Sequence, residues 1–227
     1  MDLRNLFYNV YLLLFFFIFY SPAIAQDQPT FPELEDAARA AIKEVQEKFP
    51  EFSDTYMTVI GGLGVWKHLP KGRRTMDVDL LTSIPGAPQT VKQKLLGVPG
   101  SPFTQRSQYF LWRHPDGKNI QVDFPPSWQS PFTPSGARRL GQVRLPELPY
   151  ATPEDLLALK INSSGLRATI EKRRVDAADA DALAEMLLSR GPIVLTPEQR
   201  RAAQGGLEDL LKYSTKDEAW WRRALQL

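Results

Sequence analysis

Three aspartates, each inside an apolar, strand-like segment, carry most of the chemical information in this chain of 227 residues. Asp77 and Asp79 are separated by one valine, and Asp123 lies in a second alternating segment. Successive side chains of a strand point to opposite faces, so Asp77 and Asp79 project together while their apolar neighbours face a core. Adjacent like charges repel unless a cation neutralises them. The pattern therefore predicts a divalent metal site, because Mg²⁺ takes carboxylate oxygens and commonly bridges them to phosphates.

A tight hairpin is expected to bring the third aspartate to the same place. Residues 107–113 and 118–124 are typical of two antiparallel strands, since a Pro-Asp-Gly turn sequence separates them. If the second strand lies beside the first aspartate pair with its apolar face inward, Asp123 completes a three-carboxylate site able to hold two metal ions. Half-exposed strands also alternate acidic and apolar residues, so a merely solvated face is the alternative interpretation.

A glycine pair precedes the aspartates. Residues 55–60 are rich in β-branched and aromatic side chains and predict a strand that stops at Gly61 and Gly62, after which residues 63–69 are expected to form a short helix. A strand, a glycine turn and a helix start present free backbone N–H groups to phosphate oxygens. A glycine pair alone is also typical of an ordinary tight turn, so its combination with the three acids is what favours a phosphate site.

The ordered set of glycine turn, paired acids and third acid resembles the DNA polymerase β-type nucleotidyltransferase superfamily. Within it, residues 61–81 look most like the small AbiEii-like nucleotidyltransferases, many of them toxins of toxin–antitoxin pairs, in which an Arg-x-Thr-x-Asp-x-Asp segment follows the glycines. Here that segment is residues 73–79, with Arg73 or Arg74 near the family's arginine position. The resemblance implies that a nucleotide is bound by Gly61, Gly62, Arg74 and Thr75.

A later segment supports the same subgroup. A helix is expected to begin with Thr152 as N-cap, Pro153 at its first position and Asp155 in the capping-box position. In AbiEii-like proteins a similar helix carries a lysine and is followed by an arginine and a Lys-x-x-x-Asp element, which match Lys160, Arg167, Lys172 and either Asp176 or Asp179. The resemblance implies that Lys160 binds the nucleotide; the alternative is a solvated lysine that complements the helix dipole.

The resemblance implies an α/β (α+β) nucleotidyltransferase fold, with a mixed sheet flanked by helices. The catalytic core would occupy residues 26–149 and a helical C-terminal region residues 150–227. The implied activity moves an NMP group from an NTP to an acceptor hydroxyl and releases pyrophosphate. Mg²⁺ or Mn²⁺ would be held by the three catalytic acids, which are Asp77, Asp79 and Asp123. The acceptor (RNA, protein or small molecule) stays open, as does an antitoxin-like protein partner.

Two other function classes stay open at this point. The first is a non-catalytic, secreted or membrane-tethered binding module that retains the nucleotidyltransferase fold. The second is a structural domain whose acids are all solvated. Composition narrows the choice further: the chain has no cysteine, which excludes disulfides, thiolate zinc sites and thiol catalysis. The net charge of +2 is too mild to indicate nucleic acid as the acceptor.

The N-terminus predicts a targeting segment. Residues 6–20 are almost entirely apolar, and a small-x-small cleavage sequence ends at Ala25, so residues 1–25 are typical of a signal peptide or an N-terminal anchor. This predicts a secretory or extracellular protein with no stable membrane span after cleavage. Because NTPs are cytosolic, the alternative is a cytoplasmic protein whose start is misassigned.

The remaining segments predict helices and one irregular region. Residues 32–48 have the spacing of an amphipathic helix. The proline-rich segment 125–149 is expected to wrap the site or cross a sheet edge, with Trp128 packed rather than stacked on a base. The rest is expected to be helical, with a break near Gly191 and a new start at Thr196.

Overall fold

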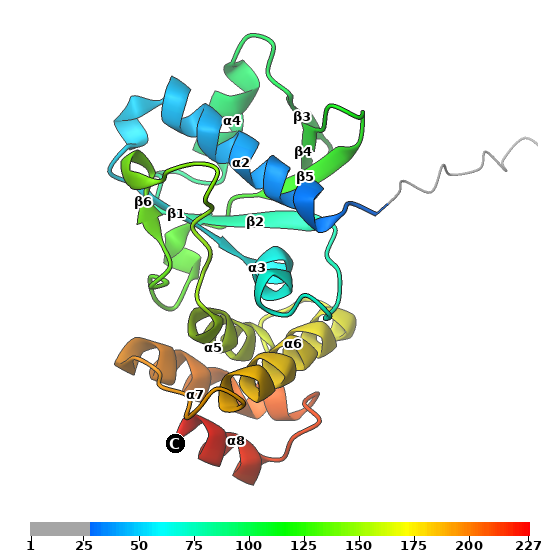
Figure 1. Cartoon of the computed structure of the whole chain (residues 1–227), viewed down its shortest axis with the longest axis vertical. Coiled ribbons are helices and arrows are strands. Elements are labelled where there is room, and N and C mark those ends of the chain that lie inside the picture. Colours follow the sequence, from blue (N-terminus) through cyan, green and yellow to red (C-terminus); the bar gives the residue numbers. More distant parts are fainter. Residues whose placement is uncertain (1–27) are drawn as a thin grey trace, which may run out of the picture.

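The computed structural model of the protein describes residues 28–227, which form a mixed sheet flanked by helices (Figure 1). This confirms the fold class predicted from the sequence. The predicted signal peptide or anchor over residues 1–25 lies outside the described residues. Within residues 28–227, no helix has both the length and the apolar character that crossing a membrane requires.

The sheet has six strands in the order β3-β4-β5-β2-β1-β6. Strands β2 and β5 run parallel, and the other neighbouring strands run antiparallel. The predicted hairpin is confirmed, since β4 pairs with β5 and Gly117 in the turn has a φ of 93°. The strands are β1 (Tyr56–Ile60), β2 (Asp77–Thr82), β3 (Phe103–Arg106), β4 (Tyr109–Arg113), β5 (Asn119–Asp123) and β6 (Arg138–Arg139).

One face of the sheet packs against α2 (Phe31–Lys48) and α4 (Gln89–Gly97) (Figure 1). Helix α2 begins with a capping box between Thr30 and Glu33 and buries an apolar stripe that includes Leu34 and Ile42. The central strands contribute the buried side chains Met57, Val59, Val78, Leu80, Ile120 and Val122. Full burial of one such side chain is worth roughly 1.5–3 kcal/mol. A slip of one residue would expose this set, so the core fixes the register that points the alternate residues away from it.

Helix α3 (Gly61–His68) connects β1 to β2 and starts directly after β1. The two glycines are therefore its first residues, whereas the sequence placed the helix start at residue 63. Val65 of α3 packs into a second hydrophobic core, which lies in the C-terminal half of the chain. Helix α3 thus lies between the sheet and the helices that follow (Figure 1).

Four helices form the C-terminal part of the molecule, at the end opposite α2 and α4 in Figure 1. They pack around buried side chains that include Leu157, Ile161 and the fully buried Trp221. The predicted capping box at Thr152 and Asp155 is present. The helices are α5 (Pro153–Ser163), α6 (Ile170–Leu188), α7 (Pro197–Leu211) and α8 (Glu218–Leu225). The domain boundaries proposed from the sequence stay predictions.

The proline-rich segment between β5 and α5 runs partly along the sheet edge, where its strand β6 pairs with β1. Its 3₁₀ turn η2 (Ser127–Gln129) places Trp128 in solvent, with 77% of its surface exposed. The predicted packing role of Trp128 is therefore wrong. Prolines precede and follow this short turn, at positions 126 and 131.

Candidate active site

The three aspartates lie together at the ends of two neighbouring strands. Because β2 and β5 are parallel and in register, Asp79 lies opposite Asp123 and Asp77 lies opposite Gln121. One carboxylate oxygen from each of Asp77, Asp79 and Asp123 lies within 4.8 Å of the other two. A single cation placed between them would contact all three, which is the juxtaposition that the alternating sequence pattern predicts.

The three carboxylates differ in their protein partners. Asp77 accepts a hydrogen bond from the hydroxyl of Thr75 at 2.6 Å. Asp123 accepts one from the side-chain amide of Gln121 and lies 3.6 Å from Nζ of Lys92. Asp79 accepts no hydrogen bond from any residue in the range 28–227. Burial, together with the charges of Asp77 and Asp123, raises the pKa of Asp79 to about 7. The site is therefore short of positive charge at Asp79.

The glycine pair makes room for this arrangement. A Cβ at Gly61 would overlap Oδ2 of Asp79, and a Cβ at Gly62 would overlap the side chain of Thr75. Gly61 also has a φ of 64°, in the left-handed region that favours glycine. The first turn of α3 has no side-chain cap, so its N–H groups are not occupied by a capping side chain. Gly61 and Gly62 therefore lie against the acids, and their predicted contact with a nucleotide stays a prediction.

Lys160 reaches the same region from α5 and is only 4% exposed. Its Nζ atom lies 2.6 Å from Oδ1 of Asp176 and 2.8 Å from Oδ2 of Asp179. The solvated-lysine interpretation is therefore wrong. Both candidate aspartates of the last sequence motif contact this lysine, because α6 presents the two carboxylates on one face, three residues apart. Which of the two matches the family's motif residue stays open.

Two partly exposed arginines complete this ion-pair network around the buried carboxylates. Nε of Arg167 lies 2.6 Å from Asp176, and Arg73 holds Asp179 through two hydrogen bonds of 2.8 and 2.7 Å. Burial of Asp176 opposes its ionisation, but Lys160 and Arg167 outweigh that effect and lower its pKa. Three cations thus face two carboxylates, which leaves a net charge of +1 beside the three acids of the sheet.

The two adjacent arginines that could match the family's arginine, Arg73 and Arg74, have different surroundings. Arg73 lines the same cavity as Asp77 and Thr75. The side chain of Arg74 is exposed and makes no hydrogen bond or ion pair within the described part of the chain. The geometry favours Arg73 as the arginine of the site, while a nucleotide-binding role of Arg74 stays a prediction. Sequence spacing alone does not separate two adjacent arginines in a loop.

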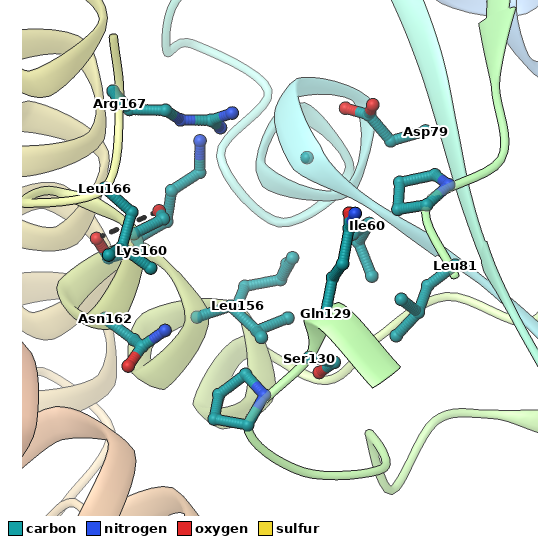
Figure 2. Close-up of a pocket in the computed structure, with 15 residues that line it drawn as sticks. Ile60, Asp79, Leu81, Gln129, Ser130, Leu156, Lys160, Asn162, Leu166 and Arg167 are labelled. Atoms are coloured by element: carbon teal, nitrogen blue, oxygen red, sulfur yellow. Dashed lines mark hydrogen bonds between the residues drawn. The ribbon is translucent and has the colours of Figure 1, made fainter. Parts of the chain in front are cut away.

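Two cavities, each of about 240 Å³, lie on either side of Asp79 and share it as a wall residue. The first is polar and lies over the three aspartates, with Thr75, Gln121 and Lys172 on its walls. The second has mainly apolar walls and extends toward α5 (Figure 2). Asp79, Lys160 and Arg167 line both cavities. These charged groups therefore lie between the polar cavity and the apolar one.

A solved structure identifies the fold. The crystal structure of an antigenic nucleotidyltransferase-like protein from Paracoccidioides brasiliensis is similar over 86% of this chain and 93% of that chain, with 19% sequence identity and a TM-score of 0.57. This chain has a nucleotidyltransferase-like fold. The nucleotidyltransferase toxin MenT4 from Mycobacterium tuberculosis H37Rv is similar over 86% of this chain and 71% of that chain, with 16% identity and a TM-score of 0.44. No protein-family model matches the sequence, and no curated protein matches it.

In this nucleotidyltransferase-like fold, Asp155 has a role that the sequence did not reveal. Its carboxylate is fully buried and accepts hydrogen bonds from five donors: the N–H and hydroxyl of Ser135, the N–H groups of Gly136 and Thr152, and the amide of Gln199. It thereby joins the proline-rich segment to α5 and α7. The capping-box pattern predicts only the bond to Thr152, because the other donors come from distant parts of the chain.

Proposed function

We propose that the protein is a metal-dependent nucleotidyltransferase of the AbiEii-like kind, which moves an NMP group from an NTP to an acceptor hydroxyl and releases pyrophosphate. The observation that carries this proposal is the convergence of Asp77, Asp79 and Asp123 in a nucleotidyltransferase-like fold. Asp79 supports it further, since a carboxylate with a raised pKa and no protein donor is typical of a functional site.

The donor set fits Mg²⁺ or Mn²⁺. Both are hard cations that prefer oxygen ligands, and the three aspartates offer only carboxylate oxygens. Asp77 and Asp79 would hold the metal, and Asp123 would contribute to a second metal position. Such ions supply charge neutralisation at the transferred phosphoryl group and at the oxygens that attack and leave. Cysteine is absent from the whole chain, which makes thiolate-preferring metals a poor fit.

The residues of the chain then divide the work of the reaction. The N–H groups at Gly61 and Gly62 would receive phosphate oxygens at the start of α3. The acceptor oxygen attacks the α-phosphorus in line, the bond from that phosphorus to the pyrophosphate oxygen breaks, and Asp123 accepts the proton of the acceptor hydroxyl. Lys160 and Arg167, beside Asp79, would stabilise the negative charge that develops on the phosphates.

A transfer assay tests the proposal. The purified protein is incubated with each α-phosphate-labelled NTP and Mg²⁺ or Mn²⁺, in the presence of total RNA or total protein, and the products are separated on a gel. We expect label to move to one acceptor class with the wild type and not with Asp77→Asn. Asp54→Asn is the matched control, because Asp54 is an exposed acid that pairs with Arg139 and lines neither cavity. Binding of metal and NTP without any transfer would instead support a non-catalytic module.

A further inference from the structure

The apolar cavity beside the three acids is the feature of the molecule that the proposed chemistry leaves without an occupant. Helix α5 forms one wall and the η2 turn forms the opposite one (Figure 2). The walls are mainly aliphatic and include Leu81, Leu156, Leu159, Leu166, Pro125 and Pro131. Such a surface offers little to a charged phosphate and much to a flat, largely apolar ring.

The sizes of the two cavities indicate one ligand that spans both. Each has a volume of about 240 Å³, below the roughly 300–1,000 Å³ typical of small-molecule sites. They share Asp79, Lys160 and Arg167 as wall residues, so they are neighbours. A molecule with one charged part and one aromatic part would fill them together, with its charged part over the aspartates and its ring between the aliphatic side chains.

Two side-chain amides face this cavity without protein partners. Asn162 on α5 and Gln129 on the η2 turn lie on opposite sides of it (Figure 2). Neither side-chain amide takes part in a hydrogen bond among residues 28–227. Each offers one acceptor and two donor hydrogens, which matches the mixed donors and acceptors on the edge of a nucleobase.

We infer that the apolar cavity receives the base of the bound NTP, and that Asn162 and Gln129 select among bases. The inference rests on the proposed function, since it takes the triphosphate to lie over the three aspartates. Leu159 and Leu166 cover the faces of the ring, while the amides contact its edge. A base that leaves these amides unpaired binds more weakly than one that pairs with both.

Equilibrium binding separates the two halves of the ligand. Isothermal titration of the full chain with Mg²⁺ compares the four α,β-methylene NTP analogues with tripolyphosphate, which has the charge but no base. We expect at least one analogue to bind about tenfold or more tightly than tripolyphosphate. Asn162→Ala and Leu166→Ser should reduce that advantage about tenfold, and Asn162→Ala should also change the order of preference among the four bases. Both variants should bind tripolyphosphate as the wild type does.

The controls make failure of this inference distinct from failure of the proposed function. Val194→Ser matches Leu166→Ser, because the two residues are 77% and 76% exposed and Val194 does not line the cavity. If analogues and tripolyphosphate bind equally well, and Asp77→Asn abolishes both, the proposed function stands and the base assignment is overturned. The base assignment is also overturned if Asn162→Ala binds nucleotides as the wild type does but has a higher KM for the acceptor. That result would mean that the cavity receives the acceptor. If neither ligand binds the wild type, both proposals fail together.

Discussion

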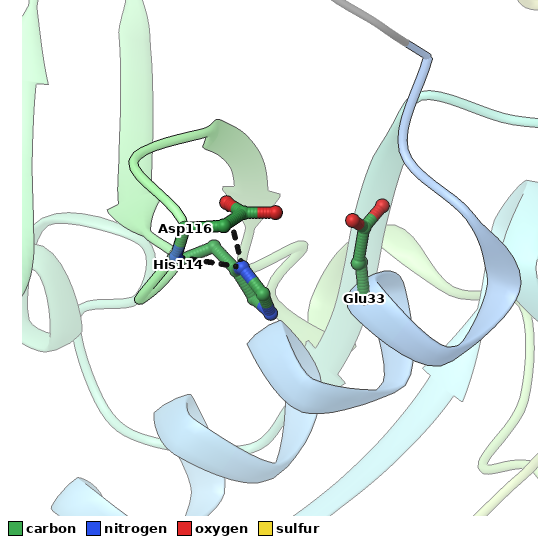
Figure 3. A group of neighbouring side chains, drawn as sticks. All are labelled: Glu33, His114 and Asp116. Carbon is green, nitrogen blue, oxygen red and sulfur yellow. Dashed lines mark hydrogen bonds and ion pairs between the residues drawn. The ribbon is translucent and has the colours of Figure 1, made fainter.

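Two groups of potential metal ligands in this molecule have similar spacing and opposite environments. Asp77, Asp79 and Asp123 form one group, and Glu33, His114 and Asp116 form the other (Figure 3). In each group, one ligand atom per residue lies within 4.8 Å of the other two. Distance alone therefore gives the two groups equal standing as cation sites, and their surroundings have to decide between them.

The ligand atoms of the second group are already engaged by the protein. Glu33 accepts a hydrogen bond of 2.6 Å from Lys118 and one of 2.7 Å from the N–H of Thr30, where it closes the capping box of α2. Asp116 lies 2.7 Å from Nδ1 of His114 and accepts a hydrogen bond from the N–H of Lys118. The hydrogen bond from Lys118 is the largest cause of the lowered pKa of Glu33. Here Lys118 supplies positive charge to both acids, since its Nζ atom lies 2.6 Å from Glu33 and 3.8 Å from Asp116.

The contrast teaches that unsatisfied charge marks a site better than clustering does. Lys118 neutralises Glu33, and the pKa of Asp116 is lowered as well, chiefly by its hydrogen bond from the backbone of Lys118. Asp79 instead has a raised pKa and adjoins two cavities. The first arrangement stabilises a helix start and a turn, whereas the second becomes favourable when a cation binds.

The largest difference between the two groups should appear in activity. Asp79→Asn should reduce nucleotidyl transfer at least about 1,000-fold, because metal ions contribute several kcal/mol to such transition states and each 1.36 kcal/mol is a factor of ten. Asp116→Asn should leave the rate unchanged. The measurement is the initial rate of label transfer under saturating Mg²⁺ and NTP. Equal losses in the two variants would remove the distinction between the groups.

The second difference concerns stability, and it compares Lys160, which lies beside the three aspartates, with Lys118 of the second group. Lys160→Met should destabilise the fold by about 3 kcal/mol, because it removes the buried ion pairs of Lys160 with Asp176 and Asp179 and leaves both buried carboxylates without that partner. Lys118→Met should cost less than about 1 kcal/mol, since its side chain is 27% exposed against 5% for Lys160. Urea unfolding at pH 7 measures both. A cost for Lys118→Met as large as that for Lys160→Met would show that the two environments are alike.

The pH dependence of stability should follow from the raised pKa of Asp79. A carboxyl group whose folded pKa of about 7 exceeds its ordinary value of 3.8 contributes stability below pH 3.8, and this contribution is lost as the pH rises through 7. Asn stays neutral at every pH. The free energy of unfolding of Asp79→Asn relative to the wild type should therefore increase by about 2 kcal/mol as the pH rises from 5 to 8. Urea unfolding in EDTA measures this gain. A difference that does not change with pH would contradict the assigned electrostatics.

Much of the site followed from local patterns in the sequence. Alternation in β2 and β5 predicted which way Asp77, Asp79 and Asp123 point, because a strand has a fixed period of two. The capping box at Thr152 was equally readable, since it depends on residues three apart. These features need only the local chain and one assumption about which strands are neighbours.

The parts that the sequence did not predict depend on contacts between distant segments. The partners of Lys160 lie on α6, and their identity required the packing of α5 against that helix. The donors to Asp155 likewise come from three separate segments. Trp128 was misplaced for a related reason: its exposure depends on how a proline-rich segment crosses the molecule, which no local periodicity encodes.

The smallest predicted effect concerns the capping acid of the second group. Glu33→Gln keeps the capping box, because glutamine accepts the same N–H bond, but removes the charge that pairs with Lys118. The folded pKa of Glu33 lies below its ordinary value of 4.5, so its contribution is present above that pH and is lost as the pH falls through the folded pKa. The variant should be less stable by about 0.2–1 kcal/mol at pH 7, with no difference once both forms are neutral at acid pH. Urea unfolding at pH 7 and at acid pH measures this difference in stability, and a repeat in 1 M salt screens the ion pair.

The transfer activity of Glu33→Gln should match that of the wild type. A loss of activity would mean that the second group takes part in function after all.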